Sequence, residues 1–187
     1  MSVLGGRVLL TGVLLVLLTA CASYPDIVTP HPVLGNVNAS VHVIEYSDME
    51  CPACRQAYAT MHVLLDKYND SISFEYKHFP LSQHRHSYKA AIAAECANDY
   101  GQYYAFLERA FTNPDLDGTA LKAHAILLGI PEQAFSACLS SATKQAVVDE
   151  NVRSGIKLGI TETPSFFVNG KNVKLSQLEG ELQRLLT

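Results

Sequence analysis

The chain has 187 residues, of which 48% are hydrophobic and 17% charged, so it has enough apolar material for one buried core. This composition excludes a disordered tail protein. Eighteen acidic residues outnumber fourteen basic ones, the formal net charge at pH 7 is −4, and no run of basic residues occurs. Because phosphate binding needs clustered cations, no nucleic-acid partner is expected.

Residues 1–20 have the pattern of an export signal. Arg7 is their only charge, and the apolar stretch of about eleven residues that follows it is too short for a stable membrane span. The sequence Leu18-Thr19-Ala20-Cys21 resembles the lipobox of bacterial lipoproteins, in which the cysteine receives a lipid and becomes the new amino terminus. We therefore expect a lipoprotein signal peptide and lipidation at Cys21. An ordinary signal peptide or an uncleaved anchor is the alternative.

Residues 21–33 are expected to be a short extended tether, because they contain Pro25, Pro30 and Pro32 and no amphipathic period. A lipid on Cys21 would hold the domain at the extracytoplasmic face of a bacterial membrane, in the periplasm or at the cell surface. Disulfides persist in such compartments.

The five cysteines are an odd number for an exported protein. Assigning Cys21 to a lipid leaves Cys51 and Cys54, in Cys-Pro-Ala-Cys, and Cys96 and Cys138, in two predicted helices. An oxidising compartment favours a structural disulfide between Cys96 and Cys138. Two small buried thiols are the alternative.

Strand patterns lie at the two ends of the domain, and a helical block lies between them. Residues 41–46 predict a strand, the residues from Cys51 to Tyr68 a helix, and residues 72–79 a second strand that Pro80 ends. Residues 82–160 contain no convincing strand. Their patterns predict helices over 88–100, 102–111, 119–129, 131–140 and 142–158.

Residues 161–187 return to strand character. Residues 165–168 and 171–174 flank Asn169-Gly170, a strong hairpin signal, and Ser176 with Glu179 forms a capping box that predicts a last helix. The order of elements predicts an α/β, thioredoxin-like fold with an inserted all-helical domain. Residues 34–81 and 161–187 would form the thioredoxin-like part, residues 82–160 the insertion, and the two early strands would be parallel and central.

Cys51-Pro52-Ala53-Cys54 lies where the first predicted strand meets the first predicted helix. Unpaired N–H groups and the positive end of the helix dipole favour a thiolate at this place, and a proline is tolerated there. The thiolate is the species that attacks and departs in disulfide exchange. We therefore expect Cys51 to be the exposed nucleophile and Cys54 the resolving thiol.

Two other interpretations of this motif are a zinc half-site and a purely structural disulfide. A zinc site usually needs a second close pair of Cys or His ligands. His84-x-His86 is only a weak candidate for that pair, so no metal is expected.

Four blocks of the sequence resemble the DsbA-like family of thiol-disulfide oxidoreductases: VHVIEYSDMECPAC, FEYKHFPLSQHRHSYKAAIAAECA, GQYYAFLERAF and GITETPSFFVNG. They lie in order between about Pro32 and Leu185. The resemblance implies a dithiol oxidase that acts on reduced exported proteins and is reoxidised by a membrane redox partner. It implies no cofactor beyond a Cys51–Cys54 disulfide, and we expect a monomer.

The resemblance also assigns roles to single residues. Thr163-Pro164, just before a predicted strand, matches the family's cis-proline loop, which faces the redox cysteines. Pro164 would then belong to the catalytic site, and Pro52, Ala53 and Thr163 would contact substrate, the backbone of Thr163 pairing with an incoming peptide. An ordinary trans proline is the alternative.

Glu45 stands six positions before Cys51, where the family carries a buried acid. In that position it would be catalytic, carrying the proton of Cys54, and Lys77 on the neighbouring strand is a candidate partner. The alternatives are a surface acid at the end of a strand and a solvated lysine.

The sequence departs from the family pattern at three places. Ala53 stands where the most oxidising members have histidine, Glu162 replaces the usual glycine before Thr-Pro, and Tyr104 takes the place of a core tryptophan. Without a histidine beside Cys51 we expect a milder oxidant, by tens of millivolts. A reductase in the same compartment and a non-enzymatic lipoprotein binding module with a structural Cys-x-x-Cys are the alternatives.

Overall fold

The computed structural model describes residues 29–187, so the expected signal peptide over 1–20 and the candidate lipidation site Cys21 lie outside the described residues. Its strands are β1 (Leu34–Gly35), β2 (Val41–Ser47), β3 (Ile72–His78), β4 (Ser165–Val168) and β5 (Lys171–Val173). Its helices are α1 (Pro52–Tyr68), α2 (Ser87–Asn98), α3 (Tyr103–Thr112), α4 (Gly118–Leu127), α5 (Glu132–Cys138), α6 (Ala142–Lys157) and α7 (Leu175–Leu186). No helix within residues 29–187 is both long and apolar enough to cross a membrane.

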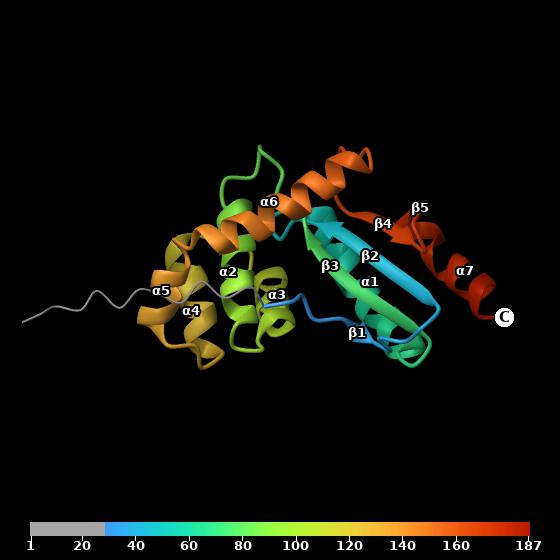
Figure 1. The fold of residues 1–187 in the computed structure, drawn as a ribbon, viewed down its shortest axis with the longest axis horizontal. Coiled ribbons are helices and arrows are strands. Elements are labelled where there is room, and N and C mark those ends of the chain that lie inside the picture. Colours follow the sequence, from blue (N-terminus) through green and yellow to red (C-terminus); the bar gives the residue numbers. More distant parts are fainter. Residues whose placement is uncertain (1–28) are drawn as a thin grey trace, which may run out of the picture.

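One five-stranded sheet, in the order β1-β3-β2-β4-β5, forms the centre of the thioredoxin-like part (Figure 1). β2 and β3 are parallel, and the other neighbouring strands pair antiparallel. The mostly apolar sequence of β2 suits a central strand that is covered on both faces, whereas β3 alternates apolar and polar residues. The predicted fold class and the two central parallel strands are confirmed.

The edge strand β1 was not predicted, because a strand of two residues is too short to show an alternation of apolar and polar side chains. Gly35 has a φ of +79°, and a Cβ there would clash with the carbonyl oxygen of Ile72. A glycine is therefore needed for β1 to pair with β3. At the opposite edge, Asn169 and Gly170 both have positive φ and form the predicted hairpin turn between β4 and β5.

Helices cover both faces of the sheet. Side chains of α1 and α7, including Met61 and Leu182, pack in one cluster with Val43 of β2. On the opposite face Tyr46 packs with Phe167 and other apolar residues, and α6 runs across this region toward β4 (Figure 1). The carboxyl ends of β2 and β3 and the amino end of α1 therefore meet beside the helical domain.

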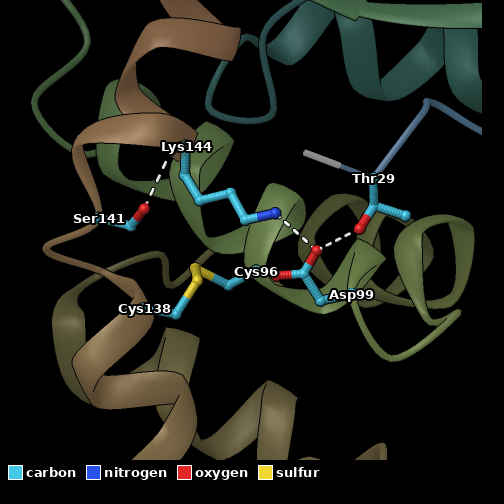
Figure 2. The surroundings of a disulfide bond; sticks show 6 residues. All are labelled: Thr29, Cys96, Asp99, Cys138, Ser141 and Lys144. Atoms are coloured by element: carbon cyan, nitrogen blue, oxygen red, sulfur yellow. Dashed lines mark hydrogen bonds and ion pairs between the residues drawn. A yellow bond between two sulfur atoms is a disulfide. The ribbon is translucent and has the colours of Figure 1, made fainter. Parts of the chain in front are cut away.

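Helices α2 to α6 form the inserted domain between β3 and β4, and all of them fall within the predicted range 82–160. A disulfide joins Cys96 of α2 to Cys138 of α5, with the two Cα atoms 5.9 Å apart (Figure 2). Close to it, the buried Lys144 of α6 pairs with Asp99 over 2.6 Å. The structure thus has the disulfide that the cysteine count suggested.

The amino-terminal residues 29–33 differ from the tether that the sequence suggested. Thr29 donates a hydrogen bond to Asp99, as Figure 2 shows, and the side-chain amide of Asn98 donates to the carbonyl oxygens of Thr29 and Pro30. The hydroxyl of Tyr104 donates to the carbonyl of Pro32 over 3.0 Å. The prolines correctly suggest an extended chain, but this chain is bound to the helical domain rather than free. Its partners lie about 70 residues away in the sequence, so no local sequence pattern could indicate the contacts.

Two local predictions are wrong. Helix α7 begins at Leu175 with Lys174 as its N-cap, so Ser176 lies inside the first turn and forms no capping box. In α3 it is Tyr103, only 1% exposed, that fills the core, whereas Tyr104 is half-buried. The neighbouring position, rather than Tyr104, therefore takes the place expected for a core aromatic ring.

Candidate active site

The Cys-x-x-Cys motif forms the first turn of α1, as predicted. Cys51 is the N-cap, Pro52 is the first helical residue, and no side chain caps the turn. Both Cys51 and Cys54 are thiols in this structure. Cys51 is 6% exposed and Cys54 is fully buried, so Cys51 is less exposed than expected but is the one that solvent reaches.

The Thr163-Pro164 peptide bond is cis and lies against the first cysteine. The Sγ atom of Cys51 donates to the carbonyl oxygen of Thr163 over 3.5 Å. The Cys-x-x-Cys motif and the Thr163-Pro164 loop, more than a hundred residues apart in the sequence, are therefore in contact. Pro52 and Ala53 are exposed beside it.

The second cysteine is enclosed by protein. The backbone N–H of Asp48 donates to the Sγ of Cys54 over 3.5 Å. Burial raises the pKa of the Cys54 thiol, because a thiolate loses its hydration there. Cys54 therefore favours the protonated form when the pair is reduced, and its proton needs a carrier whenever the pair cycles.

Glu45 lies on β2 in the face that packs against α1, on the same side as Val43. It is 1% exposed, and neither carboxylate oxygen has a hydrogen-bond partner among residues 29–187. Burial raises the pKa of Glu45 to about 7, and the Ser47 hydroxyl acts in the opposite direction. A carboxyl group with this pKa can both take up and release a proton near neutral pH.

The candidate partner Lys77 does not lie near Glu45. Tyr76 is the residue of β3 that pairs with Glu45, and Lys77 pairs with Tyr46 on the opposite face. Lys77 instead contacts Glu75, over 3.4 Å. Side chains alternate along a strand, so a neighbour one position away faces the other side of the sheet.

Sequence reasoning missed an acidic residue that supports the site. The buried carboxylate of Asp48 accepts hydrogen bonds from the backbone N–H groups of Glu50 and Leu81, both over 2.8 Å. It also accepts from Nδ1 of His84, over 2.7 Å. Glu50 in turn accepts from the backbone N–H of His86. These contacts fasten the loop before Cys51 to the loop after β3. In the sequence, only the two acids Asp48 and Glu50 just before the motif could have indicated this network.

A shallow cavity of about 240 Å³ lies beside the cis-proline loop. Its lining includes Leu158, Ile160, Glu162 and Ser165. Leu158 is 51% exposed, so an apolar side chain and an acidic one border the same hollow.

The family model described as thioredoxin matches residues 28–187. Among solved structures, a thioredoxin-like oxidoreductase from Silicibacter pomeroyi DSS-3 is 28% identical, with a TM-score of 0.75, and the match covers 86% of this chain and 92% of that one. BdbD from Bacillus subtilis, in its oxidised form, is 22% identical over 83% of this chain and 92% of its own, with a TM-score of 0.75. It shares the fold.

Curated relatives include the Na⁺/H⁺ antiporter NhaA of Herminiimonas arsenicoxydans, 30% identical over 141 residues. The match covers 75% of this chain and 22% of that protein, so the chain spans less than a quarter of its length. The fold, the Cys51 and Cys54 thiols and the family match over residues 28–187 are all consistent with one family. The chain belongs to the thioredoxin family.

Proposed function

We propose that the protein is a lipid-anchored dithiol oxidase outside the cytoplasm, which passes a Cys51–Cys54 disulfide to thiol pairs in reduced exported proteins. The contact between Cys51 Sγ and the backbone of Thr163 carries the proposal, because it holds the reactive sulfur where a bound peptide would lie. The Cys96–Cys138 disulfide supports a place outside the cytoplasm. A chain that keeps a structural disulfide belongs where disulfides form and persist.

The reaction begins from the oxidised pair. A client thiolate attacks Cys51 Sγ, the Cys51–Cys54 bond breaks, and Cys54 departs and takes a proton, for which Glu45 is the proposed carrier. A second client thiolate then attacks the client sulfur of the mixed disulfide and releases Cys51. The client loses two electrons and gains a disulfide, and the enzyme is left as a dithiol.

Substrate binding is assigned to the backbone of Thr163, the cis residue Pro164, and the exposed Pro52 and Ala53. The backbone of Thr163 would pair with an extended client segment, as peptides pair with a free strand edge. Such contacts recognise backbone rather than sequence. They suit a protein that acts on many clients.

The anchor is assigned to Cys21. Seven residues lie between it and Thr29, and the eight Cα–Cα steps from residue 21 to residue 29 span at most roughly 25–30 Å when fully extended. A lipid at Cys21 would therefore keep the helical domain within that distance of the membrane surface. A membrane redox partner that reoxidises the dithiol would find its substrate there, and one monomer suffices for the reaction.

A reductase in the same compartment is the second candidate. Ala53 favours it, because a methyl group between the cysteines offers no hydrogen bond or charge to a thiolate at Cys51. Stabilising the reduced form is what makes such a pair oxidising. A binding module with a structural Cys-x-x-Cys would instead show no dependence on Cys51.

The reduction potential of the Cys51–Cys54 pair, measured against glutathione, separates these candidates. We expect a value between about −120 and −200 mV, and a value near the −270 mV of thioredoxin would favour the reductase. The anchor is tested by labelling cells with a radioactive fatty acid. The wild type and the Cys96→Ser/Cys138→Ser control should carry label, whereas Cys21→Ser should not.

A further inference from the structure

A second group of side chains meets where the amino-terminal segment, the sheet and the helical domain join. His31 comes from the segment before β1, His78 ends β3, and Glu95 lies in the middle of α2. One donor atom from each lies within 4.8 Å of the other two. None of the three takes part in the reaction described above.

Glu95 is a buried anion held by two imidazoles. Its side chain and that of His78 are each 1% exposed, and that of His31 is 10% exposed. Nε2 of His31 and Nε2 of His78 lie 2.6 and 3.0 Å from the same oxygen, Oε1 of Glu95. Burial alone would raise the pKa of Glu95, but hydrogen bonds from the two histidines outweigh it and hold the value at about 2.

Aromatic rings fix the directions of the two imidazoles. The ring of Tyr103 stacks on that of His31, with centroids 5.2 Å apart and planes at 25°. The ring of Tyr76 packs with its edge toward His78, at 5.3 Å. The hydroxyl of Tyr103 also lies 3.1 Å from Nε2 of His78. Both Nε2 atoms are therefore held toward Glu95 rather than left to rotate.

Of the three residues, His31 borders a cavity, so an ion would enter beside His31. A cavity of about 390 Å³ is lined by His31, Glu75, Asn151 and others, and it is large enough for water and small ions. Oε1 of Glu75 lies 4.0 Å from Nδ1 of His31. At this distance there is no hydrogen bond, but the carboxylate lies on the side of the second ring nitrogen, and an acceptor there commonly orients a histidine ligand on a metal.

We propose that His31, His78 and Glu95 form a binding site for a first-row transition-metal dication, with Zn²⁺ as the probe ion. Two imidazoles and one carboxylate suit Zn²⁺ or Cu²⁺, whereas Ca²⁺ and Mg²⁺ prefer oxygen ligands alone. Three protein ligands leave a fourth position, which a water from the cavity fills.

Metal entry keeps the proton count of the rings unchanged. Each imidazole moves its proton from Nε2 to Nδ1, Nε2 binds the ion, and Nδ1 of His31 then donates toward Glu75. Tetrahedral Zn²⁺ sets its donor atoms roughly 3.3 Å apart. The two His–Glu pairs, now 2.6 and 3.0 Å apart, therefore need to open by about 0.7 and 0.3 Å to reach that spacing. The donor atoms of the two histidines, which lie within 4.8 Å of each other, need to come to the same spacing.

A bound ion would fasten the amino-terminal segment to the enzyme. Of the three ligands only His31 lies before β1, and the other two belong to the sheet and the inserted domain. The ion would therefore cross-link the segment before β1 to the sheet and to helix α2. The site is independent of the direction in which the thiols work.

Calorimetric titration with Zn²⁺ tests the site, with the protein in its oxidised form so that Cys51 and Cys54 cannot bind the ion. We expect one Zn²⁺ per chain. His31→Gln should weaken binding by about 100-fold or more, Glu75→Gln by about 10-fold, and the exposed control His62→Gln should leave it unchanged. His31 lies in a terminal segment, so this variant keeps the folded core even if Glu95→Gln does not.

Nitrogen-15 NMR of the histidine rings gives a second measurement. Zn²⁺ should move the proton of two rings from Nε2 to Nδ1 in the wild type, and in His31→Gln it should leave the remaining ring, that of His78, unchanged. The proposal is overturned if oxidised wild-type protein takes up no Zn²⁺ at about 100 µM, or if His31→Gln binds as tightly as the wild type.

Discussion

Cys51 donates a hydrogen bond from its Sγ to the carbonyl oxygen of Thr163, over 3.5 Å, although 112 positions separate the two residues in the chain. Cys54 has no exposed surface, so a client sulfur reaches the pair through Cys51. Solvent exposure therefore determines which of the two cysteines a client sulfur attacks first, and that cysteine is Cys51. This asymmetry gives the most direct prediction for the site.

Replacing either cysteine should give a different defect. Cys51→Ser should abolish disulfide transfer to a reduced client, because no accessible sulfur is left to form the mixed disulfide. In Cys54→Ser the thiolate of Cys51 should attack a client disulfide, release one client sulfur as a thiolate and remain joined to the other, because no resolving thiol is left. These mixed disulfides should be seen on non-reducing gels and lost on adding dithiothreitol. The Cys96→Ser/Cys138→Ser variant is the control and should form none. Equal trapping by Cys51→Ser and Cys54→Ser would contradict the assignment.

Glu45 should make stability fall as pH rises. In the unfolded chain its carboxyl has a pKa near 4.5, and in the folded protein near 7, so the folded state binds the proton more tightly. The resulting stabilisation is full below pH 4.5 and is lost as pH rises through 7, a difference of about 3 kcal/mol. The neutral variant Glu45→Gln lacks this loss.

Urea unfolding at pH 4, 6 and 8 measures the effect as a difference between Glu45→Gln and the wild type. The relative stability of the variant should increase by about 3 kcal/mol from pH 4 to pH 8. Other titrating groups contribute equally to both proteins and cancel. A difference that does not change with pH would show that Glu45 titrates alike in both states.

The sequence predicted what depends on local pattern. A mostly apolar run predicted β2, alternation before Pro80 predicted β3, and the Cys-Pro junction predicted where α1 begins. Burial of Glu45 followed only from a resemblance, since one acid in an apolar strand does not show which way it faces. Lys77 failed as its partner because the register places Tyr76 opposite Glu45, and register is a long-range property.

Contacts between distant segments could not be predicted. His31 and Glu95 are 64 positions apart, and Asp48 and His84 are 36 apart. Histidines and acids at such separations carry no period, so they look like ordinary polar residues in the sequence. The same holds for the hydrogen bonds that attach Thr29 to the helical domain.

Asp48 should support both stability and the redox pair. Asp48→Ala leaves the backbone N–H groups of Glu50 and Leu81, and the imidazole of His84, without an acceptor. A fully buried unpaired donor costs about 1–3 kcal/mol, but these three donors are only partly buried and water can reach them, so we expect a total loss of roughly 2–4 kcal/mol in urea unfolding. The exposed Asp70→Ala is the matched control and should stay within about 0.5 kcal/mol.

A second measurement separates the local role of Asp48 from stability alone. Its backbone N–H faces Cys54, so loosening the loop should shift the reduction potential of the pair. Asp48→Asn keeps one acceptor oxygen and should restore part of the stability and of the potential. An Asp48→Ala protein with an unchanged potential would show that the loop supports the fold but not the thiols.

Two glycines in helices should respond to alanine in opposite directions. A Cβ at Gly155 in α6 would lie 2.6 Å from a ring atom of Phe79 and 3.2 Å from one of Tyr46. Phe79 is only 7% exposed and has little room to move. Crowding of this kind costs about 1–3 kcal/mol and outweighs the gain of roughly 0.5–1 kcal/mol from replacing a helical glycine.

Gly180 in α7 is the matched control, because a Cβ there meets nothing within 4 Å. Gly180→Ala should therefore stabilise the protein by about 0.5–1 kcal/mol, whereas Gly155→Ala should destabilise it by about 1–2 kcal/mol. Urea unfolding of the two variants beside the wild type checks both signs. Stabilisation by Gly155→Ala would mean that Phe79 can move aside and that α6 packs less tightly against the active-site loops than these distances indicate.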